Sequence, residues 1–368
     1  MDSIQKIYRL LLLIIIGGLA WNILPFLASI IGMLIFAFLF TTIFLQGVDR
    51  LERYTKSRGL GVFLILTSVI SIGVVFFGSF VSNLGSQIKL FTQKLQKEDF
   101  ALSLENLSGK IRDSLPDFLG NMIPEGDKMI VIAKNSLVNV FQSILTLIGS
   151  AGGFLFIAVM VLIFTIILLI EYHDFKRSLV RFIPNKYLEV GLRMIYNIEQ
   201  QISKYLRGQI LAASSVAVLS VIGLFILNQL GANITLIVFI GIIAGLANLI
   251  PMVGPFIGMI PAILIALMNN IGSESALTHQ LFGAVPSPFY ILDIVLMFII
   301  VQQIDNNFIT PVLVGESVGL HPMAVMIVLL IGGTLIGPLG MLFAIPAAGV
   351  LKVVISEIVF VTKNSHLL

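Results

Sequence analysis

The sequence of 368 residues contains no cysteine, which excludes disulfide bonds and thiolate metal sites. Charge is also scarce, because Asp, Glu, Lys and Arg make up 11% of the chain, against roughly 25% in an average soluble domain. So few charged residues cannot cover a water-soluble globule of 40.2 kDa, which excludes soluble enzymes and disordered proteins. The net charge of +3 requires no nucleic-acid partner, since basic cytoplasmic loops explain it.

Motifs for nucleotide binding and hydrolysis are missing as well. The sequence holds no Gly-x-x-x-x-Gly-Lys-Ser/Thr phosphate loop, so ATP cannot power the protein by that route. It holds no His-Glu-x-x-His pair and no Gly-x-Ser-x-Gly turn, and its four histidines are scattered. We therefore expect no enzymatic activity, no cofactor and no bound metal.

Hydrophobic residues are abundant, at 58% of the chain, and they form long uninterrupted runs. Runs of this length and composition are typical of transmembrane helices, and about six of them are full spans. The first two runs are separated only by Pro25, and we expect them to form a transmembrane hairpin. The six runs are Leu10–Leu24, Phe26–Gly47, Leu60–Ser82, Ile144–Ile170, Gln209–Leu230 and the run that begins at Phe289.

Charge orients these spans. The segment Val48–Gly59 has four basic and two acidic residues, which gives a net charge of +2. The segment Glu171–Arg207 has seven basic and four acidic residues, which gives +3. Between them, the long segment Asn83–Ser143 has seven basic and seven acidic residues and is neutral. By the positive-inside rule, the two basic segments and both termini are cytoplasmic and Asn83–Ser143 is external. We expect a multi-pass protein of the bacterial inner membrane, with membrane lipids as partners.

The segments outside the membrane have the periodicity of amphipathic helices. In the external region, apolar residues recur at steps of three and four between Leu104 and Met122 and again between Leu84 and Leu95. After Pro184, a similar stripe predicts an interfacial helix that runs into the fifth span. The chain then divides into N-terminal helices (1–82), the external amphipathic region (83–143), a span with a cytoplasmic helix (144–208) and a C-terminal transport core (209–368).

Two apolar elements in the C-terminal half are broken. Residues Thr235–Asn269 would make a straight helix of about 50 Å, too long for a hydrocarbon core of roughly 30 Å. This stretch is interrupted at Asn248–Pro255 by two prolines and a glycine, and Met323–Ile355 is interrupted in the same manner at Gly337–Met341. We predict two re-entrant helical hairpins that enter from opposite faces, an arrangement typical of secondary transporters. Two proline-kinked helices are the alternative.

Polar residues near these breaks are the candidate site. Charged groups inside a membrane usually face a cavity or a partner, and Gln302, Asp305 and Asn306 share one helical face. The alternatives are a solvated helix end for Asp305, an interfacial carboxylate for Asp293 and a helix cap for His321. The predicted solute or ion pathway contains Asn248, Pro251, Gly254, Pro255, Gln302, Gln303, Asp305, Asn306 and Asn307. The candidates for proton coupling are Asp305, Asp293, Glu316 and His321, and the tip of the second hairpin contains Gly337, Pro338 and Gly340.

Four motifs resemble the autoinducer-2 exporter family of bacterial membrane proteins, also described as PerM-like permeases. They are Tyr205-Leu206-Arg207-Gly208-Gln209, the segment from Asn248 to Pro255, the segment from Gln302 to Pro311, and Leu320-His321-Pro322 followed by Gly332-Gly333. The resemblance implies an inner-membrane homo-oligomer that moves a small solute. We expect export of a small organic molecule such as autoinducer-2, with or without proton coupling. A sodium or lithium/proton antiporter, and an oligomeric pore or scaffold, are the alternatives.

Overall fold

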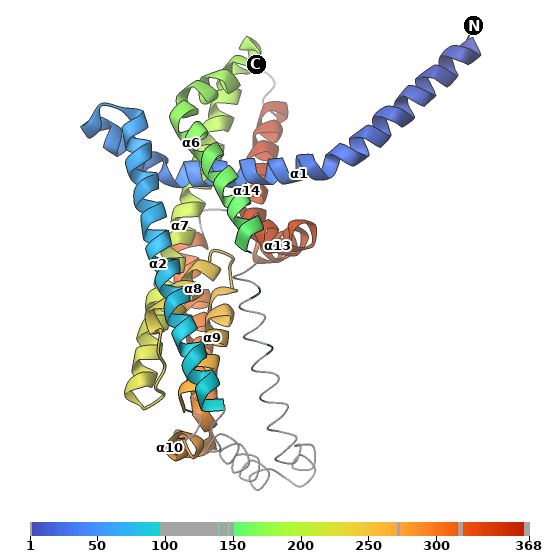
Figure 1. Cartoon of the computed structure of the whole chain (residues 1–368). Coiled ribbons are helices and arrows are strands. Elements are labelled where there is room, and N and C mark those ends of the chain that lie inside the picture. Colours follow the sequence, from blue (N-terminus) through green and yellow to red (C-terminus); the bar gives the residue numbers. More distant parts are fainter. Residues whose placement is uncertain are drawn as a thin grey trace. The chain divides into compact units, whose positions relative to one another are not determined.

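The computed structural model of the chain describes residues 2–95, 139, 146, 151–270, 273–315 and 319–363. This part is almost entirely α-helical, and six of its helices are long and apolar enough to cross a membrane. The predicted all-α polytopic fold is therefore confirmed (Figure 1). The amphipathic helices predicted between Leu104 and Met122, and the candidate Glu316, lie outside the described residues.

The chain forms two compact units, of which the first contains residues 1–71 and 146–184. Its first helix, α1 (Asp2–Thr55), is continuous through Pro25, so the predicted hairpin of the first two apolar runs is wrong (Figure 1). A helix of 54 residues is about 80 Å long, and its second half, from Ile30, is a membrane-span candidate. Pro25 removes one backbone donor, and the apolar residues on both sides continue the helix.

The first unit is completed by the start of α2 (Arg58–Leu95) and by α6 (Ala151–Arg181). Val48, Val62 and Leu169 are buried together where the three helices meet. The guanidinium of Arg58 joins them, because its Nε donates to the carbonyl oxygen of Leu169 at 2.6 Å. It also binds the carboxylates of Asp49 and Glu52, at 3.2 and 2.9 Å. The turn between α1 and α2 is thus held against α6.

The second unit contains residues 72–145 and 185–368 and begins with the remainder of α2. After a short 3-10 turn, η1 (Asn185–Tyr187), α7 (Leu188–Gln229) runs for 42 residues without a break. The predicted helix after Pro184 that continues into the fifth span is therefore confirmed. Its 42 residues extend about 60 Å, so α7 reaches well beyond a single bilayer core.

The first broken element is a helical hairpin made of α8 (Ile237–Ala247) and α9 (Gly254–Asn270). The end of α9 returns to the start of α8, because Asn270 Nδ2 donates to the carbonyl oxygen of Ala232 at 2.6 Å. A single kinked helix would carry these residues far apart, so the alternative of a kink is wrong here. Met252, in the turn at the tip, has a φ of 70°, a strained conformation for a residue with a Cβ.

Glycines allow α8 to approach α7 closely. A Cβ on Gly245 would lie 2.6 Å from the Cβ of Ala217 and 2.7 Å from the carbonyl oxygen of Ala213, both on α7. Gly241, one turn earlier, lies equally close to α7. This pair has the Gly-x-x-x-Gly spacing that lets two helix backbones come together.

The chain leaves the first hairpin through short elements and then forms one long helix. These short elements are α10 (Glu274–Leu277), the antiparallel strands β1 (Gln280–Leu281) and β2 (Val285–Pro286), and the 3-10 turn η2 (Pro288–Tyr290). The helix α11 (Ile291–Ile304) follows and passes directly into two π-helical turns, η3 (Asp305–Ile309) and η4 (Pro311–Gly315). Wide turns of this kind often mark functional sites.

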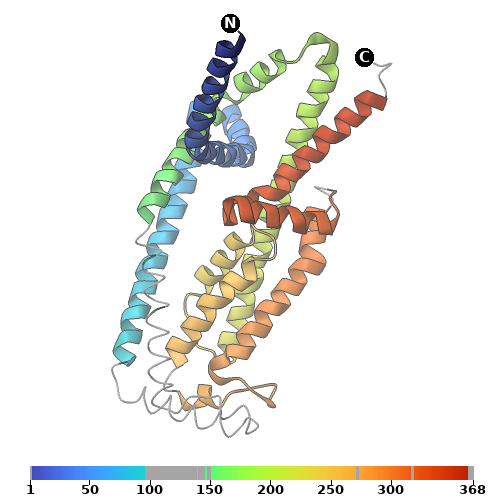
Figure 2. The same cartoon turned by 90° about the vertical axis from the view of Figure 1, so that its right-hand side faces the viewer.

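The second broken element consists of α13 (Pro322–Ile336) and α14 (Pro338–Lys363). The break is at Gly337, whose φ of 71° and ψ of −149° suit a residue without a Cβ. The two helices fold back on each other, because Lys352 Nζ donates to the carbonyl oxygen of Gly319 at 2.6 Å. In both views α13 lies crosswise to α7 (Figures 1 and 2). Membrane re-entry from opposite faces stays a prediction.

Candidate functional site

The tip of the first hairpin meets the end of α11 in a buried polar site. Asn248 ends α8, and its side chain is 1% exposed. Its Nδ2 donates to Oδ2 of Asp305 at 3.3 Å, and its backbone carbonyl accepts from Nε2 of Gln209 at 2.6 Å. Asn248 therefore links α7, the hairpin tip and η3, and we call Gln209, Asn248 and Asp305 the tip site.

Asp305 lies inside the protein, at 1% exposure. It is the first residue of the π-helical turn η3, and its Oδ1 accepts from Thr310 Oγ1 at 3.1 Å, while Oδ2 accepts from Asn248. The alternative of a solvated helix end is therefore wrong. A buried carboxylate is costly unless it is hydrogen-bonded or protonated, and here each oxygen of Asp305 accepts one hydrogen bond.

Two amide oxygens of the predicted pathway residues are buried without a hydrogen-bond partner among the described residues. They are Oδ1 of Asn248 and Oε1 of Gln302, which lies one helical turn before Asp305. Buried polar atoms are normally satisfied, so each exception calls for an explanation such as a water or an ion. Carboxylate and amide oxygens accept protons, water hydrogens or hard cations. In the part described, no group of three or more His, Asp or Glu side chains forms a metal site.

The predicted pathway residues divide into two sets. Gln302 and Asn306 are hydrogen-bonded through Nε2 and Oδ1 at 2.9 Å on the same helical face as Asp305. Gln303 and Asn307 are exposed and bond to each other at 3.2 Å, so the structure does not bring them to the tip site. Among the tip residues, Gly254 and Pro255 are buried and Pro251 is partly buried.

The prediction missed Gln209 and Thr310 as members of the site. Both were contained in the motifs that carry the family resemblance, but neither is charged or breaks a helix. Gly208, the residue before Gln209, lets η4 approach α7 closely, because a Cβ on Gly208 would collide with the carbonyl of Leu313. The signal available in the sequence was a glutamine within a long apolar stretch, and the structure shows that it is buried.

Asp293 belongs to a second polar cluster, at the start of α11. Its side chain is 6% exposed, so it is buried rather than a solvated interfacial carboxylate. Ser287 Oγ donates to one carboxylate oxygen, and Nε2 of His279 lies 3.3 Å from the other. The ring of His279 stacks on Tyr290 at 3.9 Å between centroids, and Tyr290 donates to the carbonyl of Leu230 at 3.1 Å. This cluster fastens the strand pair to α11 and to the end of α7.

The remaining candidates lie elsewhere. His321 caps α13, because its Nδ1 accepts from the backbone N–H of Met323 at 3.2 Å, so the helix-cap alternative is confirmed. At the second hairpin, the N–H of Gly337 donates to the carbonyl of Gly333 at 2.9 Å, within the hairpin itself. Among the described residues, no hydrogen bond joins Gly337, Pro338 or Gly340 to the tip site.

A multi-pass helical chain with a buried carboxylate at an interrupted hairpin has the features of a membrane transporter. Comparison with known proteins agrees, because residues 10–360 match the AI-2E family transporter. The chain belongs to this family. The names of its relatives support a membrane transporter or permease.

Four relatives illustrate the similarity. Putative permease PerM of Escherichia coli (strain K12) is 26% identical over 94% of this chain and 91% of its own length. Putative transport protein YrrI of Bacillus subtilis (strain 168) is 26% identical over 78% of this chain and 76% of its own. The chain spans 66% of another relative from that organism, putative transport protein YueF, at 26% identity over 75% of this chain. A more distant relative, 22% identical, is named AI-2 transport protein TqsA.

Proposed function

We propose that the protein is a secondary transporter that exports a small organic solute across the bacterial inner membrane. The tip site is the place where solute, or a coupling proton, meets the protein. The observation that carries the proposal is the hydrogen bond between Asn248 and Asp305, which joins an unwound hairpin tip to a buried carboxylate. The name of the relative TqsA suggests autoinducer-2 as the first solute to test.

The physical argument concerns the backbone at the hairpin tip. Unwound backbone at membrane depth is tolerated only where protein or water satisfies its polar groups. At this tip the carbonyl of Asn248 is satisfied by Gln209, whereas its side-chain oxygen has no partner among the described residues. A polar solute that offers a hydroxyl group can donate to that oxygen. Protonation of Asp305 would change the bond to Asn248 and so couple a proton to movement of the tip.

Exchange of a monovalent cation for protons is the second candidate. The oxygens of Asp305, Asn248 and Gln302 are the ligand type that hard cations prefer, and two of them are buried without partners among the described residues. One carboxylate can carry either a cation or a proton, which is the basis of antiport. Flux through a pore would not depend on the carboxylate and would not saturate with solute concentration.

Reconstituted liposomes distinguish these functions. We expect efflux of autoinducer-2 that saturates with its concentration and falls at least tenfold in Asp305→Asn. The matched control, Asp174→Asn, removes a carboxylate that is 82% exposed in the first unit and should leave the rate unchanged. Sodium-driven proton flux abolished by Asp305→Asn would replace the first candidate with the second. Flux that never saturates would indicate a pore, and flux unaffected by Asp305→Asn would refute the site.

A further inference from the structure

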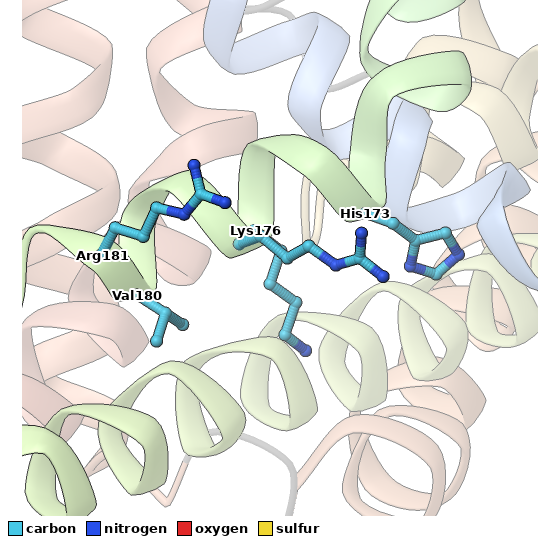
Figure 3. A pocket seen from close by; sticks show the side chains of 5 residues that line it. His173, Lys176, Val180 and Arg181 are labelled. Carbon is cyan, nitrogen blue, oxygen red and sulfur yellow. The ribbon is translucent and has the colours of Figure 1, made fainter.

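The last turns of α6 have two unlike faces. The angular step of an α-helix, about 100° per residue, places Phe175, Leu179 and Phe182 on one side. These side chains are exposed, and Phe182, directly after the helix, is 85% exposed. His173, Lys176, Arg177, Val180 and Arg181 lie on the opposite side and line a pocket of about 520 Å³ (Figure 3). An apolar stripe opposite a basic face is typical of a helix that lies in the membrane interface.

The lining of the pocket is strongly basic. Lys176, Arg177 and Arg181 supply three formal positive charges, and no carboxylate lines the pocket among the described residues. Figure 3 shows the side chains spread along consecutive turns, with His173 and Arg181 at opposite ends of the row. Arg177 is 3.6 Å from Asp174, and both side chains are largely exposed, so this ion pair is weak and leaves Arg177 able to bind an anion.

The position of the pocket follows from the packing of the first unit. The hydrogen bond from Arg58 to the carbonyl of Leu169 places the turn between α1 and α2 beside α6 at residue 169. The helix then continues for 12 residues to Arg181, about 18 Å. The last turns of α1 carry Arg50 and Arg53, and Lys56 follows in the turn between the two helices. Two basic segments, far apart in the sequence, therefore lie at the same end of this unit.

We propose that the pocket of α6 binds the phosphate group of an anionic phospholipid, while Phe175, Leu179 and Phe182 enter the boundary of the acyl chains. Lysine and arginine side chains reach phosphate groups from an interfacial helix by extending their aliphatic stems along the apolar surface. Arginine adds paired hydrogen bonds to phosphate oxygens. The exposed stripe explains why a lipid, rather than a free phosphate ion, is the ligand.

The test uses the full chain in detergent and short-chain phosphatidylglycerol, with bound lipid counted by native mass spectrometry. Phosphatidylglycerol should bind, and phosphatidylcholine at the same concentration should not. The triple variant Lys176→Gln, Arg177→Gln, Arg181→Gln should bind phosphatidylglycerol ~100-fold more weakly, because the removal of each charge weakens binding about fivefold. The control triple Lys89→Gln, Lys204→Gln, Lys363→Gln removes the same charge from exposed positions in the second unit and should bind normally.

Two further measurements distinguish a lipid headgroup from a free phosphate ion as the ligand. Phe182→Ser should weaken phosphatidylglycerol binding about tenfold, because it removes apolar surface and no charge. Inorganic phosphate at millimolar concentration should not displace the lipid. Displacement by inorganic phosphate, equal binding of phosphatidylcholine, or an equal loss in the two triple variants would each overturn the proposal. Circular dichroism of the variants checks that they remain folded.

Discussion

The hairpin tip can be tested with a single methyl group. Gly254, the first residue of α9, faces the last turn of α8, and a Cβ there would lie 2.5 Å from the carbonyl oxygen of Ala244 and 2.5 Å from the Cβ of Asn248. Ordinary contacts between such atoms are about 3.5 Å, so Gly254→Ala must displace the tip by about 1 Å. Overpacking of this kind typically costs about 1–3 kcal/mol.

The displacement acts on a hydrogen bond that is already long. Asn248 Nδ2 and Asp305 Oδ2 are 3.3 Å apart, so a further shift of about 1 Å breaks the bond. Loss of a hydrogen bond to a charged group corresponds to about 1.5–3 kcal/mol, or at least about tenfold in an equilibrium constant. We therefore expect Gly254→Ala to lower the melting temperature of the detergent-solubilised protein by several degrees and to reduce liposome transport at least about tenfold.

The control is another Gly→Ala change with the same chemistry and no obstruction. A Cβ on Gly78, in α2, meets nothing within 4 Å, and alanine is favoured over glycine in a helix by about 1 kcal/mol. Gly78→Ala should therefore keep or raise the melting temperature and keep transport. If Gly254→Ala behaves like Gly78→Ala in both assays, the close packing of the tip and its role in positioning Asn248 are wrong.

Three further substitutions test interactions that lie within one or the other of the two compact units. Arg58→Gln should reduce the stability by about 1–3 kcal/mol and so lower the melting temperature, because the carbonyl of Leu169 and two half-exposed carboxylates lose their donor. A melting temperature equal to that of the wild type would show that these contacts of Arg58 do not stabilise the protein. His279→Phe keeps the ring stack on its tyrosine neighbour and removes only the bond to Asp293, so it should cost less stability in thermal unfolding than His279→Ala, and the reverse order would be inconsistent with the stack. Glu357→Gln removes the carboxylate that binds the guanidinium of Arg193, on α7, at 2.8 Å. The resulting loss of stability, about 1 kcal/mol, should become smaller at high salt concentration. A loss of stability that does not depend on salt would argue against an ionic contact.

Much of the fold could be predicted from local patterns. Hydropathy and charge indicated a polytopic helical protein because a chain in lipid must bury its backbone in helices and keep charges at the interfaces. Proline and glycine act on their own turn of the helix, so the break at residues 248–255 and the break at Gly337 were both visible in the sequence. The same reasoning gave a wrong prediction at Pro25, because a single proline there does not end α1.

The sequence by itself also indicated the membrane class, the family and most of the polar side chains worth testing. The tertiary structure alone decided that Asn248 and Asp305, 57 residues apart, share a hydrogen bond, and that Gln209 completes their site. It also brought His279 to Asp293 through a short strand pair. The physical reason is that residue type determines which groups must be satisfied in a buried environment. Which partner satisfies them depends on how helices pack, and no local pattern contains that information.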